Sequence, residues 1–375
     1  MIIPFYTPFE KYLEKSEDCY LYDTEGKKYI DFESGVWCAN LGHNHPKINH
    51  VIKNQLKKSI HQGYLFRNRQ AENLSEKIAQ KTELKNGKSV FLSSGSEAVN
   101  LAITLAKQIT GRDKILTTDI SYLSAYGDGQ NSQKNNNLIV IPFNNSYAIQ
   151  NIDFSQIAAL VIETGGASLG IIKFPDFQFI QKLEKQAKQN GVIVIANEVT
   201  TGMGRTGKWF GFQHYNVLPD MVTTGKALGN GYPVSAVSVS KEIAKEFDDA
   251  PFCYAQSHQN DPLGCAVALE VFRIMEEENH VEKGALTGVF FKKELEKVAK
   301  NHSGTIKEIR ARGMMLALES QKEINSEKIH SQLFDNGFVT GNKFNTLRFM
   351  PPLTLPQKDV NQLIKSIKET LQLLK

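Results

Sequence analysis

Residues 192–207 read VIVIANEVTTGMGRTG and join an apolar run to a glycine-rich loop. The run Val192–Ala196 is apolar throughout and mostly β-branched, which is typical of a strand covered on both faces. Polar residues follow at once, beginning with Asn197, and glycines recur to the end of the stretch. In α/β sheets, ligands bind where the strands' carboxyl ends emerge. This stretch therefore predicts a buried strand of an α/β sheet that ends at a ligand site.

Six further short strand-like runs lie on either side of this one, several of them nearly continuous in apolar residues. They are Ser89–Ser93, Lys114–Thr117, Leu138–Phe143, Ala158–Glu163, Met221–Thr224 and Val234–Val239. Helical patterns separate some of them: one apolar face is formed by Ala98, Ala102, Leu105, Ala106 and Ile109, and another by Phe177, Ile180, Leu183 and Ala187. This alternation predicts an α/β fold in which a seven-stranded, mostly parallel sheet has helices on both sides.

The two ends of the chain have a different pattern. The first 45 residues contain a hairpin-like stretch, and the last hundred contain long helices with short strands between them. These segments are the strands Cys19–Tyr22 and Lys28–Phe32 and the helices Pro262–Glu278, Val281–Asn301 and Gln357–Leu374. We therefore expect a large α/β domain over residues 46–261 and a smaller α+β domain built from residues 1–45 and 262–375.

Composition narrows the class of protein. The chain has 375 residues, of which 41% are apolar and 22% charged, as in ordinary globular proteins. Its 44 Lys and Arg against 40 Asp and Glu leave a net charge of only +4, which does not predict a nucleic-acid partner. No apolar run approaches the roughly 20 residues that a membrane helix needs, and the first residues do not resemble a signal peptide. The four cysteines form no CxxC pair and do not combine with the nine histidines at ligand spacing. We expect a cytoplasmic protein with reduced thiols and no metal site.

Two further segments carry chemistry. Residues 93–98 (SSGSEA) join a strand end to a helix start, where small residues let backbone N–H groups approach an anion. Taken alone, this segment is more often a simple helix cap. Residues 223–233 (TTGKALGNGYP) place Lys226 among small residues just after a buried strand. Most lysines are solvated surface charges, but burial here would lower the pKa of this amine and make it nucleophilic.

Together these segments resemble class III aminotransferases, fold type I enzymes that use pyridoxal 5′-phosphate (PLP) and include acetylornithine, ornithine and ω-amino-acid aminotransferases. Further motifs in the same order extend the resemblance over nearly the whole chain. They are Tyr22-Asp23, Gly26, Tyr29-Ile30-Asp31-Phe32, Ser34-Gly35, Leu41-Gly42-His43-Asn44-His45-Pro46 and Arg348-Phe349-Met350-Pro351-Pro352-Leu353. The resemblance implies a PLP-binding large domain and a small domain from both termini.

The resemblance also implies roles at particular positions. Lys226 matches the lysine that holds PLP as a Schiff base and later moves a proton. Ser257 matches a residue that reaches the phosphate of the neighbouring subunit's cofactor, which implies a homodimer with composite sites; a helix N-cap is the alternative. The other implied cofactor contacts are the phosphate turn Ser94, Gly95 and Ser96, the ring-stacking Tyr122 (otherwise a core aromatic), Val199 under the opposite face, and Glu163.

Asn197 is the main departure from the family pattern. Relatives carry Asp at this position, and its carboxylate keeps the pyridine nitrogen of PLP protonated so that the ring accepts electrons. Asn is neutral and has only hydrogen bonds to offer. A tuned enzyme, an altered chemistry and an engineered substitution all remain open explanations. Thr200 stands where many relatives carry a Gln near the phenolic oxygen, and its hydroxyl is the expected partial replacement.

A second departure concerns substrate carboxylates. Ala125 stands where ornithine-type relatives place an arginine that grips the α-carboxylate, so this selector is lost. Those relatives also have an acidic residue near position 168 that gates a second arginine, which corresponds to Arg348. With Ser168 in its place, we expect Arg348 to be less neutralised and free to bind a substrate carboxylate, or else to form a salt bridge inside the small domain. Trp37 resembles a substrate-site aromatic of ω-amine transaminases, although burial in the core explains it equally well.

The leading hypothesis is a PLP-dependent aminotransferase that moves an amino group from an amino acid or ω-amine donor to a keto acid or aldehyde. Acetylornithine or ω-amino-acid aminotransferase is the nearest description. Another PLP reaction on the same fold is one rival (racemisation, decarboxylation, elimination or an aminomutase reaction), because Asn197 weakens the electron sink. A catalytically silent PLP-binding protein is the second rival.

Overall fold

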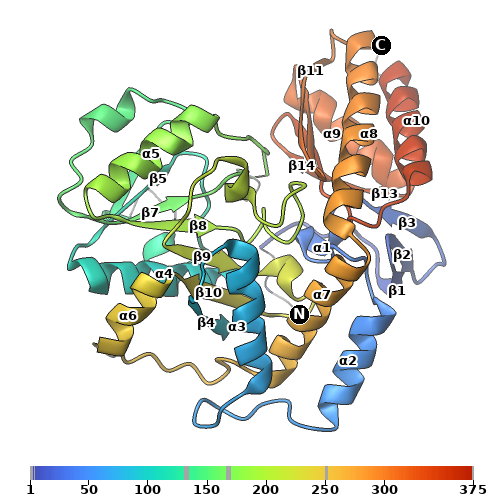
Figure 1. Ribbon diagram of the computed structural model, residues 1–375. Helices are drawn as coiled ribbons and strands as arrows, with labels where there is room; N and C mark the ends of the chain where they lie inside the picture. The colour runs from blue at the N-terminus through green and yellow to red at the C-terminus, as the bar shows by residue number, and fades with distance from the viewer. Residues whose placement is uncertain (1–2, 4, 131–134, 166–169, 250–251, 374–375) are drawn as a thin grey trace.

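The computed structural model describes residues 3, 5–130, 135–165, 170–249 and 252–373, and a seven-stranded sheet lies at its centre (Figure 1). The strand order is β4-β10-β9-β8-β7-β5-β6. All seven predicted strands are present, with ends shifted by at most two residues. Their bounds are β4 Lys88–Leu92, β5 Lys114–Thr118, β6 Leu138–Ile141, β7 Ile157–Ile162, β8 Ile193–Asn197, β9 Met221–Thr224 and β10 Ser235–Val239.

Strand direction in this sheet is mostly parallel, as predicted. β9, β8, β7, β5 and β6 run parallel to one another along the sheet. Only β10 runs antiparallel to its neighbours β4 and β9. The carboxyl ends of β7, β8 and β9 therefore emerge side by side at one edge, which is where the predicted ligand site should lie.

Helices cover both faces of the sheet. α4 (Gly95–Thr110) and α6 (Lys241–Asp249) share one apolar cluster with Ala159 and Val161 of β7. α5 (Phe177–Gln189) shares the cluster of the other face with Leu160 and Ile162 of the same strand. This two-sided burial explains the continuous apolar runs in the sequence.

One residue of the predicted α5 face is wrong. Phe177 begins the helix and is 43% exposed, whereas Phe179 is 1% exposed and packs in the core. The first turn of a helix lies at the edge of the sheet it packs on, so the 3.6-residue period alone did not decide which phenylalanine is covered.

The N-terminal and C-terminal segments pair directly. β13 (Phe338–Val339) runs parallel to β3 (Lys28–Asp31) and completes a sheet with β2 (Tyr20–Asp23) and β1 (Leu13–Glu17). A third sheet has the order β11-β12-β15-β14, with bounds Ile306–Arg312, Met315–Ser320, Thr346–Phe349 and Gly341–Lys343. A small domain built from both ends accords with this pairing. Its bounds, 1–45 and 262–375, and those of the large domain, 46–261, remain a proposal.

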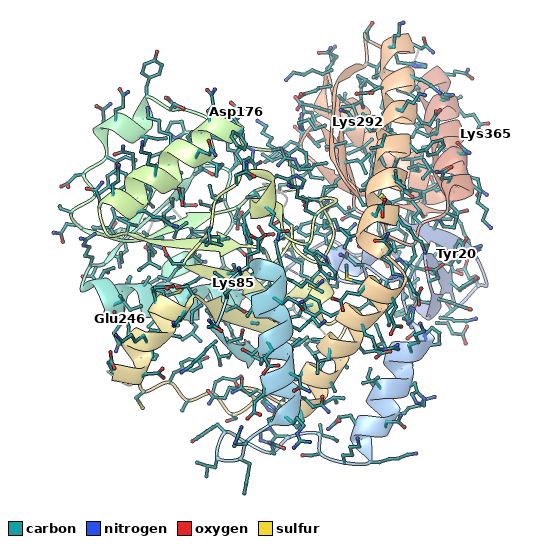
Figure 2. The ribbon with its side chains drawn as sticks, in the orientation of Figure 1. Tyr20, Lys85, Asp176, Glu246, Lys292 and Lys365 are labelled. Carbon is teal, nitrogen blue, oxygen red and sulfur yellow. The ribbon has the colours of Figure 1, made fainter. Side chains whose placement is uncertain are left out.

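The remaining helices pack around these sheets. They are α1 Ser34–Trp37, α2 Pro46–Leu56, α3 Arg69–Thr82, α7 Pro262–Glu277, α8 His280–Asn301, α9 Glu323–Asp335 and α10 Gln357–Leu373. Within the described ranges, no helix combines the length and apolar character needed to cross a membrane. Charged side chains such as Glu246 on α6, Lys292 on α8 and Lys365 on α10 project from the outer surface (Figure 2).

Candidate functional site

Three neighbouring strands bring the central residues of the site together. Glu163 follows β7 directly, Asn197 ends β8, and Gly225-Lys226 follows β9. Because these strands are adjacent and parallel, their carboxyl ends meet at one edge of the sheet. Polar residues after buried strands indicated this edge for Asn197 and Lys226, whereas Glu163 was expected here only from the family resemblance.

Lys226 sits in a sterically restricted position. Its φ of +46° lies in the left-handed region, which a lysine adopts only where the surrounding structure demands it. Nζ donates a hydrogen bond to the Thr200 hydroxyl at 2.9 Å, and it lies 5.0 Å from the centre of the Trp37 ring. Burial lowers the pKa of Lys226 from its ordinary value, while Cys38 and Glu163 oppose this shift. A larger fraction of the amine is therefore neutral and able to attack a carbonyl carbon.

The start of α4 lies beside the turn that carries this lysine. Ser94 caps the helix in a reciprocal arrangement with Glu97. Within the described part of the chain, no acceptor is recorded for the backbone N–H groups of Gly95 and Ser96, which belong to the helix N-terminus. A Cβ at Gly95 would lie 2.6 Å from Cγ1 of Val199, and one at Gly225 would lie 3.4 Å from the Gly95 Cα. Gly95 at the helix start is thus in direct contact with Val199, in the loop after β8, and with Gly225, directly before Lys226.

The loop after β5 is tied to the same group. The Tyr122 and Leu123 N–H groups donate to Glu163 Oε2 and Oε1 at 3.0 and 2.9 Å. The Ala125 N–H donates to the Ser96 hydroxyl at 3.0 Å. Tyr122 is 38% exposed and so is not a core aromatic, which was the alternative interpretation. Ala125 contributes a backbone contact to the start of α4, although its methyl group cannot grip a carboxylate.

The side chain of Asn197 makes four hydrogen-bonding contacts with described residues. Nδ2 donates to Glu163 Oε1 at 2.6 Å and faces the Leu123 carbonyl at 3.5 Å. Oδ1 accepts from the Val199 N–H at 3.3 Å and the Thr223 hydroxyl at 3.2 Å. The amide is therefore oriented, with its nitrogen toward a carboxylate and its oxygen toward two donors. Sequence analysis did not identify Thr223 or the direct bond to Glu163.

Arg348 is ion-paired and not free, so of the two expectations for it the structure shows the salt bridge. Its Nε and Nη2 contact the Glu33 carboxylate at 3.0 and 2.7 Å, and both side chains are largely buried. Its Cζ lies 4.8 Å from the Trp37 ring centre, and the Trp37 indole N–H donates to Glu33 Oε2 at 3.1 Å. Trp37 is 8% exposed and has both Lys226 and Arg348 near its ring. It is therefore buried and adjacent to the site at once.

Glu33 is the residue that sequence analysis missed here. The expectation for Arg348 considered only the segment around Ser168, and Ser168 lies outside the described residues. The available signal for Glu33 was its place directly before the Ser34-Gly35 motif. Nothing in the local sequence connects it with the strand that carries Arg348.

Two other predictions, for Thr200 and Ser257, concern contacts with the cofactor and stay predictions. The Thr200 hydroxyl accepts a hydrogen bond from Lys226 at 2.9 Å. Ser257 is exposed, and within the described residues no hydrogen bond joins its side chain to the other predicted site residues. Its neighbour Gln256 does contact Glu97 in the first turn of α4 at 3.3 Å.

One group of potential metal ligands lies outside this site. The side chains of His61, His258 and Asp261 place ligand atoms within 4.8 Å of one another. Both histidine Nδ1 atoms hydrogen-bond the Asp261 carboxylate, at 2.6 and 2.7 Å, and these bonds account for the arrangement. The absence of a metal site remains a prediction.

Comparison with known proteins agrees with this geometry. The family model for class-III aminotransferases matches residues 5–125 and 124–371. The chain is 30% identical to an acetylornithine aminotransferase of Caldanaerobacter subterraneus (98% of this chain, 96% of that one). It is 31% identical to an ornithine aminotransferase of Oceanobacillus iheyensis (98% and 95%).

Solved structures are similar over the same length. An acetylornithine aminotransferase from Elizabethkingia anophelis superposes with a TM-score of 0.88 at 28% identity, covering 99% of this chain and 96% of that one. An aminotransferase from Bacillus anthracis reaches 0.92 at 22% identity (99% and 96%), which supports the fold alone. The chain therefore belongs to the class-III aminotransferases, enzymes that use pyridoxal phosphate.

Proposed function

We propose that the chain transfers an amino group from an amino acid or ω-amine donor to a keto acid or aldehyde acceptor, with PLP held covalently on Lys226. The observation that carries this proposal is the position of Lys226, a lysine of lowered pKa at the edge where β7, β8 and β9 end. When bound, PLP supplies a carbonyl that condenses with amines and a ring that accepts electrons.

The residues of the site fit this cofactor. The α4 N-terminus offers N–H groups to a phosphate, and the missing Cβ at Gly95 keeps the approach open. Ser94 holds the helix start through its cap, and Ser96 fixes the loop that carries Tyr122. Tyr122 and Val199 would face the two sides of the ring, and Glu163 and Asn197 would lie at its nitrogen end. These assignments rest on the resemblance together with the contacts above.

Lys226 has two tasks in this proposal. It would hold the cofactor through its amine, and as a free amine it would accept a proton at Nζ from the carbon that bears the donor's amino group and pass that proton on. The Thr200 hydroxyl, 2.9 Å from Nζ, orients the amine for both tasks. The buried indole of Trp37, whose ring centre is 5.0 Å from Nζ, covers the amine on one side.

The direct test combines chemical trapping with nitrogen transfer. Borohydride reduction of the holoenzyme should attach PLP to the peptide that contains Lys226, and Lys226→Ala should lose that label. With a ¹⁵N-labelled donor, the label should appear in the amino acid formed from the keto acid. Label on another lysine would overturn the cofactor assignment. Consumption of the donor without labelled product, through racemisation, decarboxylation or elimination, would favour the rival chemistry.

We also propose a homodimer in which Ser257 contacts the partner's cofactor. The exposed position of Ser257 supports this, as does the run Tyr64-Leu65-Phe66, whose side chains are 54%, 85% and 72% exposed. Neighbouring exposed apolar residues of this size usually mark an interface. All four cysteines are free thiols, in keeping with the proposed cytoplasmic location.

A further inference from the structure

Glu163 is the buried carboxylate nearest to the neutral Asn197. Three N–H donors converge on its two oxygens: those of Tyr122 at 3.0 Å, Leu123 at 2.9 Å and the Asn197 amide at 2.6 Å. An ionised carboxylate accepts from all three donors at full strength, whereas a proton on either oxygen would weaken that oxygen as an acceptor. Burial raises the pKa of Glu163, and the donors together with Lys226 oppose that shift. The geometry therefore favours the ionised form.

The 2.6 Å contact also sets the charge that Glu163 and Asn197 carry together. An aspartate there would put an oxygen against Glu163 Oε1 at the same distance, and two carboxylates so close cannot both be ionised. With Asn197, the two residues carry one negative charge between them. This negative charge lies on Glu163, one hydrogen bond away from position 197, where relatives carry an aspartate.

We infer that Glu163 supplies the negative charge toward the cofactor ring that Asn197 lacks, and that Asn197 transmits it as an oriented amide. Glu163 is in this sense a positioning residue that acts through Asn197, and the inference rests on the proposed PLP site. The inference predicts that moving the negative charge from position 163 to position 197 preserves binding of the ring and its protonation. Removing the charge from both positions should weaken both properties.

The experiment is a charge-exchange cycle on the full-length chain with pyridoxine 5′-phosphate as the probe. This probe lacks the aldehyde and does not bond to Lys226, so the readout is independent of Lys226 chemistry and turnover. The four proteins are the original chain, Glu163→Gln, Asn197→Asp and the double variant. For each, the dissociation constant and the ultraviolet spectrum of the bound ring, which reports protonation of its nitrogen, are measured from pH 5 to 9.

Glu163→Gln should weaken binding by about tenfold or more and lower the pH at which the bound ring loses its proton. The double variant should restore both properties, with binding within about threefold of the original chain, because one negative charge has returned. If Glu163→Gln leaves ring protonation unchanged, the inference is wrong. It is equally wrong if the double variant remains as weak as the single one, since Glu163 would then act only by anchoring the Tyr122 and Leu123 N–H groups.

Asn197→Asp keeps the inference testable if Glu163→Gln does not fold. Its two carboxylates should share a proton, so its thermal midpoint should fall relative to the original chain as the pH rises through the raised pKa. An unchanged pH dependence of that difference would contradict an ionised Glu163. Glu198→Gln is the matched control, because Glu198 is also a buried carboxylate that accepts backbone N–H groups, those of Gly211 and Phe212. A shift in ring protonation in Glu198→Gln as large as in Glu163→Gln would also overturn the inference.

Discussion

Glu33 pairs with Arg348 across 315 residues of sequence, and this single contact bears on the expectation that Arg348 binds a substrate carboxylate. A largely buried arginine that already has a bidentate carboxylate partner binds a second carboxylate only if the first moves away or gives up its charge. Trp37 holds the pair in place through its indole N–H and its ring. The proposed role of Arg348 in substrate binding is therefore conditional on Glu33.

Glu33→Gln should strengthen the binding of carboxylate substrates. Removing the negative charge leaves Arg348 available, so the KM of keto acid acceptors should fall by about three- to tenfold relative to that of aldehyde acceptors without a carboxylate. Steady-state kinetics with both kinds of acceptor measure this. Glu17→Gln is the control, because Glu17 pairs with Lys15 on the surface. An equal change in KM for both kinds of acceptor would show that Arg348 does not bind substrate.

At the scale of elements, the site depends on how closely α4 approaches the end of β8. The absent side chain at Gly95 allows this contact, since its Cβ would lie 2.6 Å from Val199. The capping box of Ser94 and Glu97 then fixes the first turn, so its N–H groups point at one place.

Gly95→Ala should reduce PLP affinity by about tenfold or more, because the added methyl group pushes the helix start away from Val199. Adding Val199→Ala should recover much of the loss by making room. Equilibrium titration of the cofactor-free chain with PLP measures both effects. The control Gly304→Ala meets open space and should bind like the original chain. Unchanged affinity in Gly95→Ala would remove the α4 start from the phosphate site.

The short helix η4 (Gly211–His214) packs against the glycine-rich loop after β8, and its last residue makes this contact sensitive to acid. His214 Nε2 lies 3.2 Å from both the carbonyl and the hydroxyl oxygen of Thr206. Burial, with smaller contributions from Arg312 and Lys208, lowers the pKa of His214 to about 4. The folded chain therefore keeps this imidazole neutral at a pH where the unfolded chain protonates it.

This difference predicts a loss of stability between pH 6.5 and 4. In that window the unfolded state binds one more proton at His214, so the free energy of unfolding falls as the pH falls, by at most about 3 kcal/mol. His214→Gln should remove this contribution. Urea unfolding gives the free energy of unfolding of the variant and of the original chain at pH 7 and at pH 4.5. The difference between the two proteins should change between these two pH values. The control is His50→Gln on an exposed part of α2, which should have the same pH dependence of the free energy of unfolding as the original chain. If His214→Gln also has that pH dependence, His214 is not the buried base described here.

At the scale of the whole molecule, the segment from Leu56 to Phe66 leaves large apolar side chains uncovered. Leu65 is the most exposed of them at 85%. Covering this surface with a second copy would stabilise the assembly by about 25 cal/mol for each Å² of apolar surface removed from water. It would also account for the exposed Ser257 if that residue belongs to the partner's site.

Leu65→Asp should therefore weaken the dimer and, with it, retention of PLP. Sedimentation velocity should show the monomer fraction rising, and dialysis should strip the cofactor faster than from the original chain. Leu286→Asp is the comparison, because Leu286 is 63% exposed on α8, away from this run. Equal sedimentation of Leu65→Asp and the original chain would place the interface elsewhere.

The sequence by itself determined the sheet and the centre of the site. Alternating apolar runs and helices predicted all seven strands, and polar residues after buried strands indicated a ligand site near Asn197 and Lys226, whereas Glu163 was expected there only from the family resemblance. Both inferences depend on local periodicity and on the fact that adjacent parallel strands end at one edge, which is information carried by neighbouring residues. The buried face of α5 was less accurate, as Phe177 shows, because the 3.6-residue period does not decide which residues of the first turn are covered.

Only the tertiary structure decided which charges meet. Glu33 reaches Arg348 because the N-terminal segment lies beside the C-terminal sheet, and Glu163 holds Asn197 because β7 and β8 bring their ends within hydrogen-bonding distance. An ion pair or a hydrogen bond depends on distances of a few ångströms between residues far apart in sequence, and no local pattern specifies such distances. Polar residues at the predicted strand ends indicated where the site lies. The packing of the folded chain decided where its negative charges, those of Glu33 and Glu163, are placed.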